Sequence, residues 1–185
     1  MRGKDYLLVS SGRLTVTAGG DGMKSSEDDD ETRGFVALGA ATVTVASGDD
    51  GISATTDVTV DGTTLSITAG GGQASATVSG QEPGQGGPER GAPDQDQSAD
   101  STEADSTPSP KGINAGVAYA QDSGSVTIDA ADEGLQGAFV NVNGGSLDIA
   151  SGDDGVNASN GDSTIEGYEN ADSESDNLTD RKSVV

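Results

Sequence analysis

The most constraining feature of this sequence is a short apolar–polar–apolar triplet that returns at nearly constant intervals. Such alternation with β-branched residues, bounded by glycine-rich turns, is typical of β-strands, and no segment sustains a helical period. The sequence therefore predicts an all-β chain. The triplets are Leu14-Thr15-Val16, Val43-Thr44-Val45, Leu65-Ser66-Ile67, Val126-Thr127-Ile128 and Leu147-Asp148-Ile149.

The spacing of the triplets indicates a repeat of about 22 residues with two insertions. Val43 and Leu65 are 22 residues apart, and Val126 and Leu147 are 21 apart, whereas 61 residues separate Leu65 from Val126. Residues 81–110 contain all 5 prolines and no Val, Ile, Leu, Met, Phe or Tyr, so we expect them to form a disordered loop. Excising residues 73–110 restores the period, and residues 25–33 form the second, shorter insertion.

Each repeat contains three strand-like pieces. Residues 43–45, 52–54 and 58–60 form one such set, and residues 65–67, 113–115 and 117–119 form the next. Three short strands per repeat, stacked about 4.8 Å apart, predict a right-handed parallel β-helix of about five coils. We expect its coils over residues 1–72 and 111–160 as one domain, with residues 73–110 as a disordered insertion and residues 161–185 as a poorly ordered acidic tail.

Composition excludes several classes of function. The chain has no His and no Cys, so zinc fingers, Ser-His or Cys-His nucleophiles and thiol redox chemistry are excluded. Its net charge of −23 would repel a phosphate backbone, so we expect no nucleic-acid partner. No apolar run is long enough to span a membrane. The acidity is consistent with a solvated surface, with adaptation to high salt, or with binding of hard cations.

The turns after the triplets carry the candidate metal ligands. We align Gly20, Asp49, Gly71, Asp132 and Asp153 in one column and Asp21, Asp50, Gly72, Glu133 and Asp154 in the next. A glycine follows in most copies and is expected to supply a left-handed backbone. Asp-Asp-Gly is ordinary turn chemistry in a single copy. Stacked carboxylates repel each other, however, and with few cations nearby they favour Ca²⁺, which takes 6–8 oxygen ligands.

The turn segments, in their order along the chain, resemble a bacterial carbohydrate-binding β-helix domain related in fold to polysaccharide lyases. The resemblance rests on residues 18–25, 47–54, 110–115 and 151–158, and it covers about residues 4–160. It implies an extracellular or cell-surface right-handed β-helix that binds calcium at its acidic turns. It also implies binding of plant-wall polysaccharide, either cellulose or pectin, with acidic sugars favoured. Residues 4–9 look like the end of a coil, so we expect the chain to begin within the domain and to contain no signal segment.

Three classes of function follow from these features. The first is a non-catalytic, calcium-dependent module for acidic, uronate-containing polysaccharide, in which Lys24 and Lys111 pair with sugar carboxylates. The second is a structural or adhesin segment of a surface protein, with no ligand beyond metal. The third is a lyase, in which a Lys or Arg abstracts the proton next to a uronate carboxylate. No catalytic constellation accompanies those bases, so we expect no enzyme, and the sequence does not indicate an oligomeric state.

Overall fold

The computed structural model describes residues 1–76 and 109–158, and within them the chain is all-β, as predicted. One short 3₁₀ turn, η1 (Gln73–Ser75), interrupts the strands, and the described residues contain no α-helix. The strands are β1 (Arg2–Gly3), β2 (Tyr6–Ala18), β3 (Met23–Ser25), β4 (Phe35–Ser47), β5 (Ile52–Ala54), β6 (Val58–Val60), β7 (Thr63–Ala69), β8 (Ile113–Gln121), β9 (Gly124–Ala130), β10 (Leu135–Val142), β11 (Ser146–Ser151) and β12 (Val156–Asn157).

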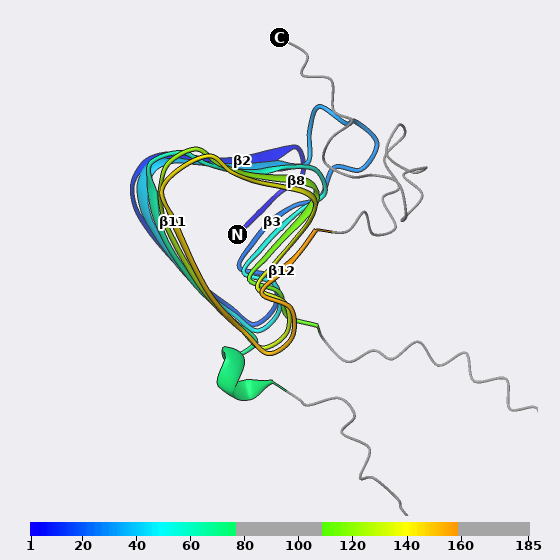
Figure 1. The fold of residues 1–185 in the computed structure, drawn as a ribbon. Helices are drawn as coiled ribbons and strands as arrows, with labels where there is room; N and C mark the ends of the chain where they lie inside the picture. The colour runs from blue at the N-terminus through cyan, green and yellow to red at the C-terminus, as the bar shows by residue number, and fades with distance from the viewer. Residues whose placement is uncertain (77–108, 159–185) are drawn as a thin grey trace, which may run out of the picture.

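All strand pairs of the described residues are parallel, and the strands form one large sheet. The five predicted triplets stack in register: Leu14 pairs with Val43, Val43 with Leu65, Leu65 with Val126 and Val126 with Leu147. The interval of 61 residues is therefore one step of the stack, like the intervals of 21 and 22. Figure 1 shows the stacked turns with a triangular outline.

Three groups of strands make up the three sides of this outline (Figure 1). The second half of β4 stacks with β2, β7, β9 and β11 on one side. On the next side β3 lies between β1 and β5, followed by the first residues of β8 and β10 and by β12. The third side contains β6 and the remaining parts of the four longest strands. Each repeat thus contributes three strand segments, as its sequence indicates.

The third strand segment of one repeat was predicted two residues too early. Val58 pairs with Tyr119 and Val60 with Gln121, so this segment is residues 119–121 and not 117–119. The prediction failed because it expected apolar residues at the buried positions of each strand. Gln121 is polar, yet it is fully buried. Its Oε1 accepts a hydrogen bond from the Tyr119 hydroxyl at 2.9 Å, and its Nε2 donates to the Ser146 carbonyl at 3.0 Å.

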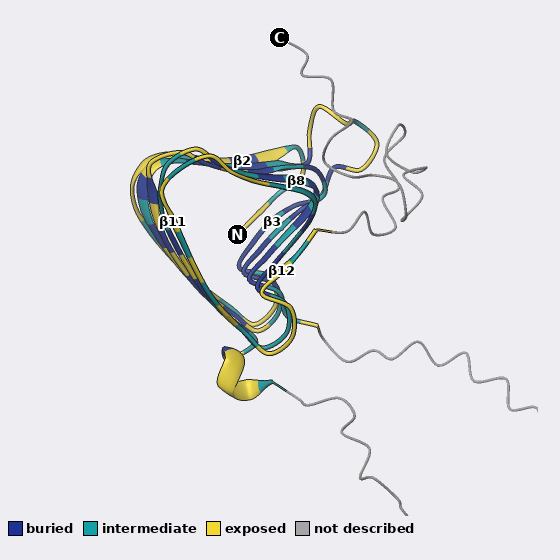
Figure 2. Cartoon of the chain, in the orientation of Figure 1, coloured by how far each residue is buried: buried dark blue, intermediate teal, exposed yellow. Residues whose placement is uncertain are grey.

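The core is a column of aliphatic side chains inside the stacked turns. Val43, Leu65 and Val126 are each at most 1% exposed, and their counterparts at the two ends, Leu14 and Leu147, are only partly buried. Figure 2 shows buried segments on all three sides of the outline. A narrow column of this kind needs few apolar residues, which explains how a chain with 31% hydrophobic residues forms a core.

The predicted insertion and tail lie mostly outside the described residues. Of residues 73–110, the first three form η1, and the Gln73 N–H donates to Asp129 Oδ1 at 2.6 Å. Residues 77–108 and 159–185 are not described, so the expected disorder of both segments stays a prediction.

Candidate functional site

The acidic turns stack along one corner of the outline, between the side that contains β4, β7 and β9 and the side that contains β3 and β5. In these turns the glycine N–H donates a hydrogen bond to a carbonyl of the next turn of the stack. The acceptor is the carbonyl of the residue that precedes the glycine in that next turn. Gly22 donates to Asp50 at 2.9 Å, and Gly51, Gly112 and Gly134 repeat the bond at 2.8–3.0 Å. This ladder defines the turn column, which contains Asp21, Asp50, Lys111, Glu133 and Asp154.

The structure corrects the predicted column at its middle position, where Pro110 and Lys111 stand instead of Gly71 and Gly72. The Gly51 N–H donates to the Lys111 carbonyl, and the backbone N–H of Asp132 donates to the Pro110 carbonyl at 3.2 Å. Gly70, Gly71 and Gly72 all have positive φ angles, from 63° to 87°, and turn the chain out of the stack into η1. The chain therefore leaves the stack before it forms the third turn of the column. Pro110 and Lys111, which follow the insertion, form that turn instead.

The turn glycines are needed for a different reason from the one predicted. Gly22, Gly51, Gly112, Gly134 and Gly155 do not have positive φ angles. In the first four, a Cβ atom would overlap a core side chain of the adjoining side, which is Val45 at Gly22 and Ile67 at Gly51. Close packing of two sides at the corner, and not a left-handed backbone, requires glycine there.

Asp50 is the most buried carboxylate of the column, with 8% of the residue exposed. Its Oδ1 accepts the Lys111 backbone N–H at 2.9 Å, and its Oδ2 accepts the Asn114 amide at 3.1 Å. Burial raises the pKa of Asp50, the two hydrogen bonds oppose this, and the charges of Asp49 and Asp21 raise it further. The charges of Asp21 and Asp49 thus lie near enough to Asp50 to disfavour its ionised form.

Two lysines neutralise part of the corner, contrary to the expectation that few cations lie nearby. Lys24 Nζ lies 2.7 Å from Asp21 Oδ2, and Lys111 Nζ lies 3.1 Å from Glu133 Oε2 and 3.4 Å from Asp132 Oδ2. Burial would lower the pKa of Lys111, but the carboxylates of Glu133 and Asp132 raise it. The Lys111 side chain is 15% exposed and that of Lys24 is 39% exposed, so Lys24 is the more accessible of the two predicted sugar-binding residues.

The remaining predicted ligands, Asp153 and Asp154, are exposed in the last described turn. Their turn repeats the local structure of the Asp49 turn, because Ser47 Oγ donates to the Asp49 carbonyl at 2.8 Å and Ser151 Oγ to the Asp153 carbonyl at 3.1 Å. The seven predicted acids therefore separate into three sets. Asp50 lies with its neighbours Asp21 and Asp49, Lys111 binds the pair Asp132 and Glu133, and Asp153 and Asp154 form the terminal pair.

Amide side chains next to the turn column were missed as possible site residues. Asn157 Nδ2 donates to Glu133 Oε1 at 2.8 Å, as Asn114 does to Asp50. The sequence contains a signal for them, since Ile113-Asn114-Ala115 and Val156-Asn157-Ala158 occupy equivalent positions after the turn glycine.

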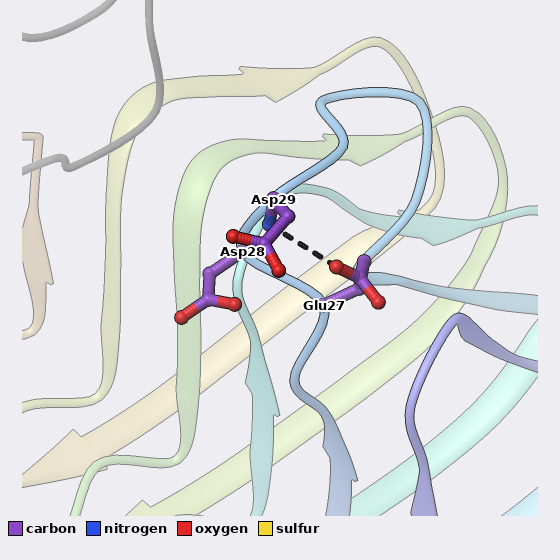
Figure 3. A group of neighbouring side chains, drawn as sticks. All are labelled: Glu27, Asp28 and Asp29. Atoms are coloured by element: carbon purple, nitrogen blue, oxygen red, sulfur yellow. Dashed lines mark hydrogen bonds between the residues drawn. The ribbon is translucent and has the colours of Figure 1, made fainter.

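The second missed group is Glu27, Asp28 and Asp29, in the loop after β3 (Figure 3). Within residues 1–76 and 109–158, it is the group in which three carboxylates each bring an oxygen within 4.8 Å of the others. Glu27 is 5% exposed, its Oε2 lies 3.0 Å from Lys4 Nζ, and its Oε1 accepts the Asp29 N–H at 3.1 Å. Sequence reasoning treated this loop only as a polar insertion.

The comparison with protein families identifies the chain. The model of a family described as carbohydrate-binding domain-containing protein matches residues 1–155, which is more than half of the sequence. The chain belongs to this family. No curated protein and no solved structure matches it.

The membership supports a carbohydrate-binding role for the chain, which the resemblance of its turns also implies. This carbohydrate-binding domain has no helix, in residues 1–76 and 109–158, with the length and apolarity that a membrane span requires. The corner places the carboxylate of Asp50 near the charges of Asp21 and Asp49, and it leaves the ammonium group of Lys24 partly exposed.

Proposed function

We propose that this chain is a non-catalytic, calcium-dependent binding module for uronate-containing polysaccharide, exposed outside the cell. The observation that carries the calcium step is the burial of Asp50 beside Asp21 and Asp49. A buried carboxylate with carboxylate neighbours is costly to ionise, and a divalent cation with several oxygen ligands removes that cost. The family membership supports the carbohydrate part of the proposal.

The residues at the corner fit a hard cation in part. The Asp50 carbonyl is already bonded to Gly22 N–H, so the protein ligands would be the carboxylates of Asp21, Asp49 and Asp50. Their oxygens do not all lie within 4.8 Å of one another in this structure, so the three side chains would have to close around the cation. Three carboxylates leave coordination positions for water or for a sugar carboxylate. A shared cation would also convert the repulsion between an acidic polymer and a chain of charge −23 into attraction. Asp132, Glu133, Asp153 and Asp154 continue the acidic edge along the corner.

The scaffold of this site is, in our proposal, a right-handed parallel β-helix. Parallel pairing of all described strands, offsets near 22 residues and the triangular outline support this architecture. Connections between parallel strands are right-handed in nearly all proteins, which supports the hand. A stack of this kind places equivalent turns on one edge, where a polymer can lie along several of them.

The test measures calcium and polymer binding together. Calorimetric titration with CaCl₂ should detect binding, and Asp49→Asn with Asp50→Asn should abolish it. Polygalacturonate should bind in calcium and be released by chelator, whereas a neutral cellulose derivative should bind more weakly. Asp61→Asn is the matched control, because Asp61 is an exposed acid away from the turn column. Polygalacturonate binding that persists in excess chelator would contradict the mechanism.

A structural or adhesin segment is the second candidate, and the ion pairs of the corner favour it. Lys24 and Lys111 already offset charges of Asp21, Asp132 and Glu133 without metal. In that case the chain should bind no polygalacturonate, either in calcium or in chelator. For the proposed site, binding to the native state alone adds about 2.7 kcal/mol at one hundred times Kd. An absorbance assay for unsaturated uronate products tests the third candidate, a lyase, and should show no product.

A further inference from the structure

A column of polar side chains lies beside the turn column, on the side of the outline that contains β3 and β12 (Figure 1). Parallel pairing places one partly exposed residue from each of five strands in this polar column. Its members are Lys24, Ser53, Asn114, Gln136 and Asn157. Ser53 lies between the buried residues Ile52 and Ala54, so the polar column faces outward while its neighbours along the strand pack in the core.

The two asparagines connect the polar column to the turn column. Asparagine is depleted in β-strands, so strand propensity does not explain why Asn114 and Asn157 stand here. Asn114 Nδ2 donates to Asp50 Oδ2 at 3.1 Å, and Asn157 Nδ2 donates to Glu133 Oε1 at 2.8 Å. These bonds join the polar column and the acids of the corner into one continuous strip.

Two members of the polar column have unused hydrogen-bonding groups. Within residues 1–76 and 109–158, the side chains of Ser53 and Gln136 make no hydrogen bond and no ion pair. They lie two strands apart, because each pairs with Asn114. Neighbouring strands are about 4.8 Å apart, which is close to the length that one ring adds to an extended polysaccharide. The unused groups would therefore face every second ring of a polymer that runs along the stack.

The charge of this side suits an acidic polymer better than the charge of the side that contains β9 and β11. The polar column contains the ammonium group of Lys24, whose side chain is 39% exposed, and no acid. Lys24 Nζ binds Asp21 and has three N–H donors, so it can bind a second carboxylate. The other side carries Asp129 and Asp148 between its buried residues, and both would repel a uronate carboxylate.

We propose that the uronate-containing polymer lies along the polar column, with its chain parallel to the axis of the stack. Ser53 and Gln136 bind hydroxyl groups of the sugar rings, and Lys24 binds a sugar carboxylate. This inference rests on the proposed function, and it adds the face of the fold and the side chains that contact the rings.

The test compares two double variants of the 185-residue chain. Ser53→Ala with Gln136→Ala removes the unused groups, so polygalacturonate in calcium should bind about tenfold more weakly. Calorimetric titration with CaCl₂ should give the affinity of the unaltered chain, because neither residue is a proposed cation ligand. Thr44→Ala with Thr127→Ala is the matched control. These exposed residues also lie two strands apart, on the neighbouring side, and each pairs with Ser66. The control should bind the polymer like the unaltered chain.

A pair of lysine variants tests where the polymer lies. Gln136→Lys should raise the affinity for polygalacturonate by about threefold, because the new ammonium group meets sugar carboxylates. Thr127→Lys changes the net charge equally and should have little effect at about 0.15 M salt, where charges more than about 8 Å apart are screened. Circular dichroism should show that all variants fold.

Three outcomes would overturn the inference. Calcium-dependent binding that is unchanged by Ser53→Ala with Gln136→Ala would overturn it and leave the proposed function standing. A loss of polymer binding in the variant of Thr44 and Thr127 instead would place the polymer on the neighbouring side. An unaltered chain that binds no polygalacturonate in calcium would overturn both this inference and the proposed function.

Discussion

At the scale of single residues, the close approach of two sides of the outline decides which residues fit at their shared corner. Gly51 lies where a Cβ atom would overlap the Ile67 side chain and the Gly112 carbonyl, whereas at Gly155, in the last described turn, such an atom would meet nothing within 4 Å. Glycine is therefore required at residue 51, and the described structure leaves room for a side chain at residue 155.

Gly51→Ala is expected to destabilise the chain by about 1–3 kcal/mol, because the added methyl group overpacks a filled corner. Gly155→Ala, the control in the same column, should change the free energy of unfolding by less than about 0.5 kcal/mol. Urea denaturation measures both values. Equal effects of the two substitutions would contradict the packing explanation.

The pKa of Glu27 leads to a prediction about pH. The hydrogen bond from Lys4 and that from the Asp29 N–H lower this pKa from its usual 4.5. The ionised carboxylate therefore stabilises the fold above about pH 4.5, and this contribution is lost as the pH falls through the lowered pKa. In chelator, Glu27→Gln should lower the melting temperature at pH 7 and have a smaller effect at pH 3. Asp28→Asn, at an exposed neighbour, should have little effect at either pH.

At the scale of elements, β8 shows how a polar pair is accommodated in the core. Tyr119 and Gln121 both point inward from this strand and are bonded to each other, and burial raises the pKa of Tyr119. In the neighbouring strand β6, Val58 pairs with Tyr119 and Val60 pairs with Gln121.

Tyr119→Phe is expected to cost about 1–3 kcal/mol, because it leaves Gln121 Oε1 without its buried donor. Adding Gln121→Leu should recover part of this loss, since removing both polar partners is less costly than removing one. Thermal unfolding of the single and double variants measures the coupling. Additive losses would show that the two side chains do not act as a pair.

At the scale of the whole molecule, stacked turns join segments on either side of the insertion. β7 pairs with β9 and β5 with β8, so the fold is continuous across residues 77–108. A Cβ atom on Gly70 would meet Pro110, which shows that the described ends of the insertion lie close together.

Replacing residues 77–108 by a short Gly-Ser linker should therefore preserve the fold. A shorter loop costs less closure entropy, so stability should rise by about 1 kcal/mol. Circular dichroism and urea denaturation check both expectations. Loss of the β-signal in the shortened chain would show that the insertion contributes contacts to the fold.

The sequence by itself determined the all-β class, the repeat and the register of Leu14, Val43, Leu65, Val126 and Leu147, because alternation and spacing are local properties. It did not predict which residue completes the turn column, since that depends on where an insertion leaves the stack and returns. Only the tertiary structure placed Lys111 beside Glu133, gathered the carboxylates of Glu27, Asp28 and Asp29, and buried Gln121. Each of these depends on neighbours from another turn or on the local path of a loop, which the pattern of residue types does not encode.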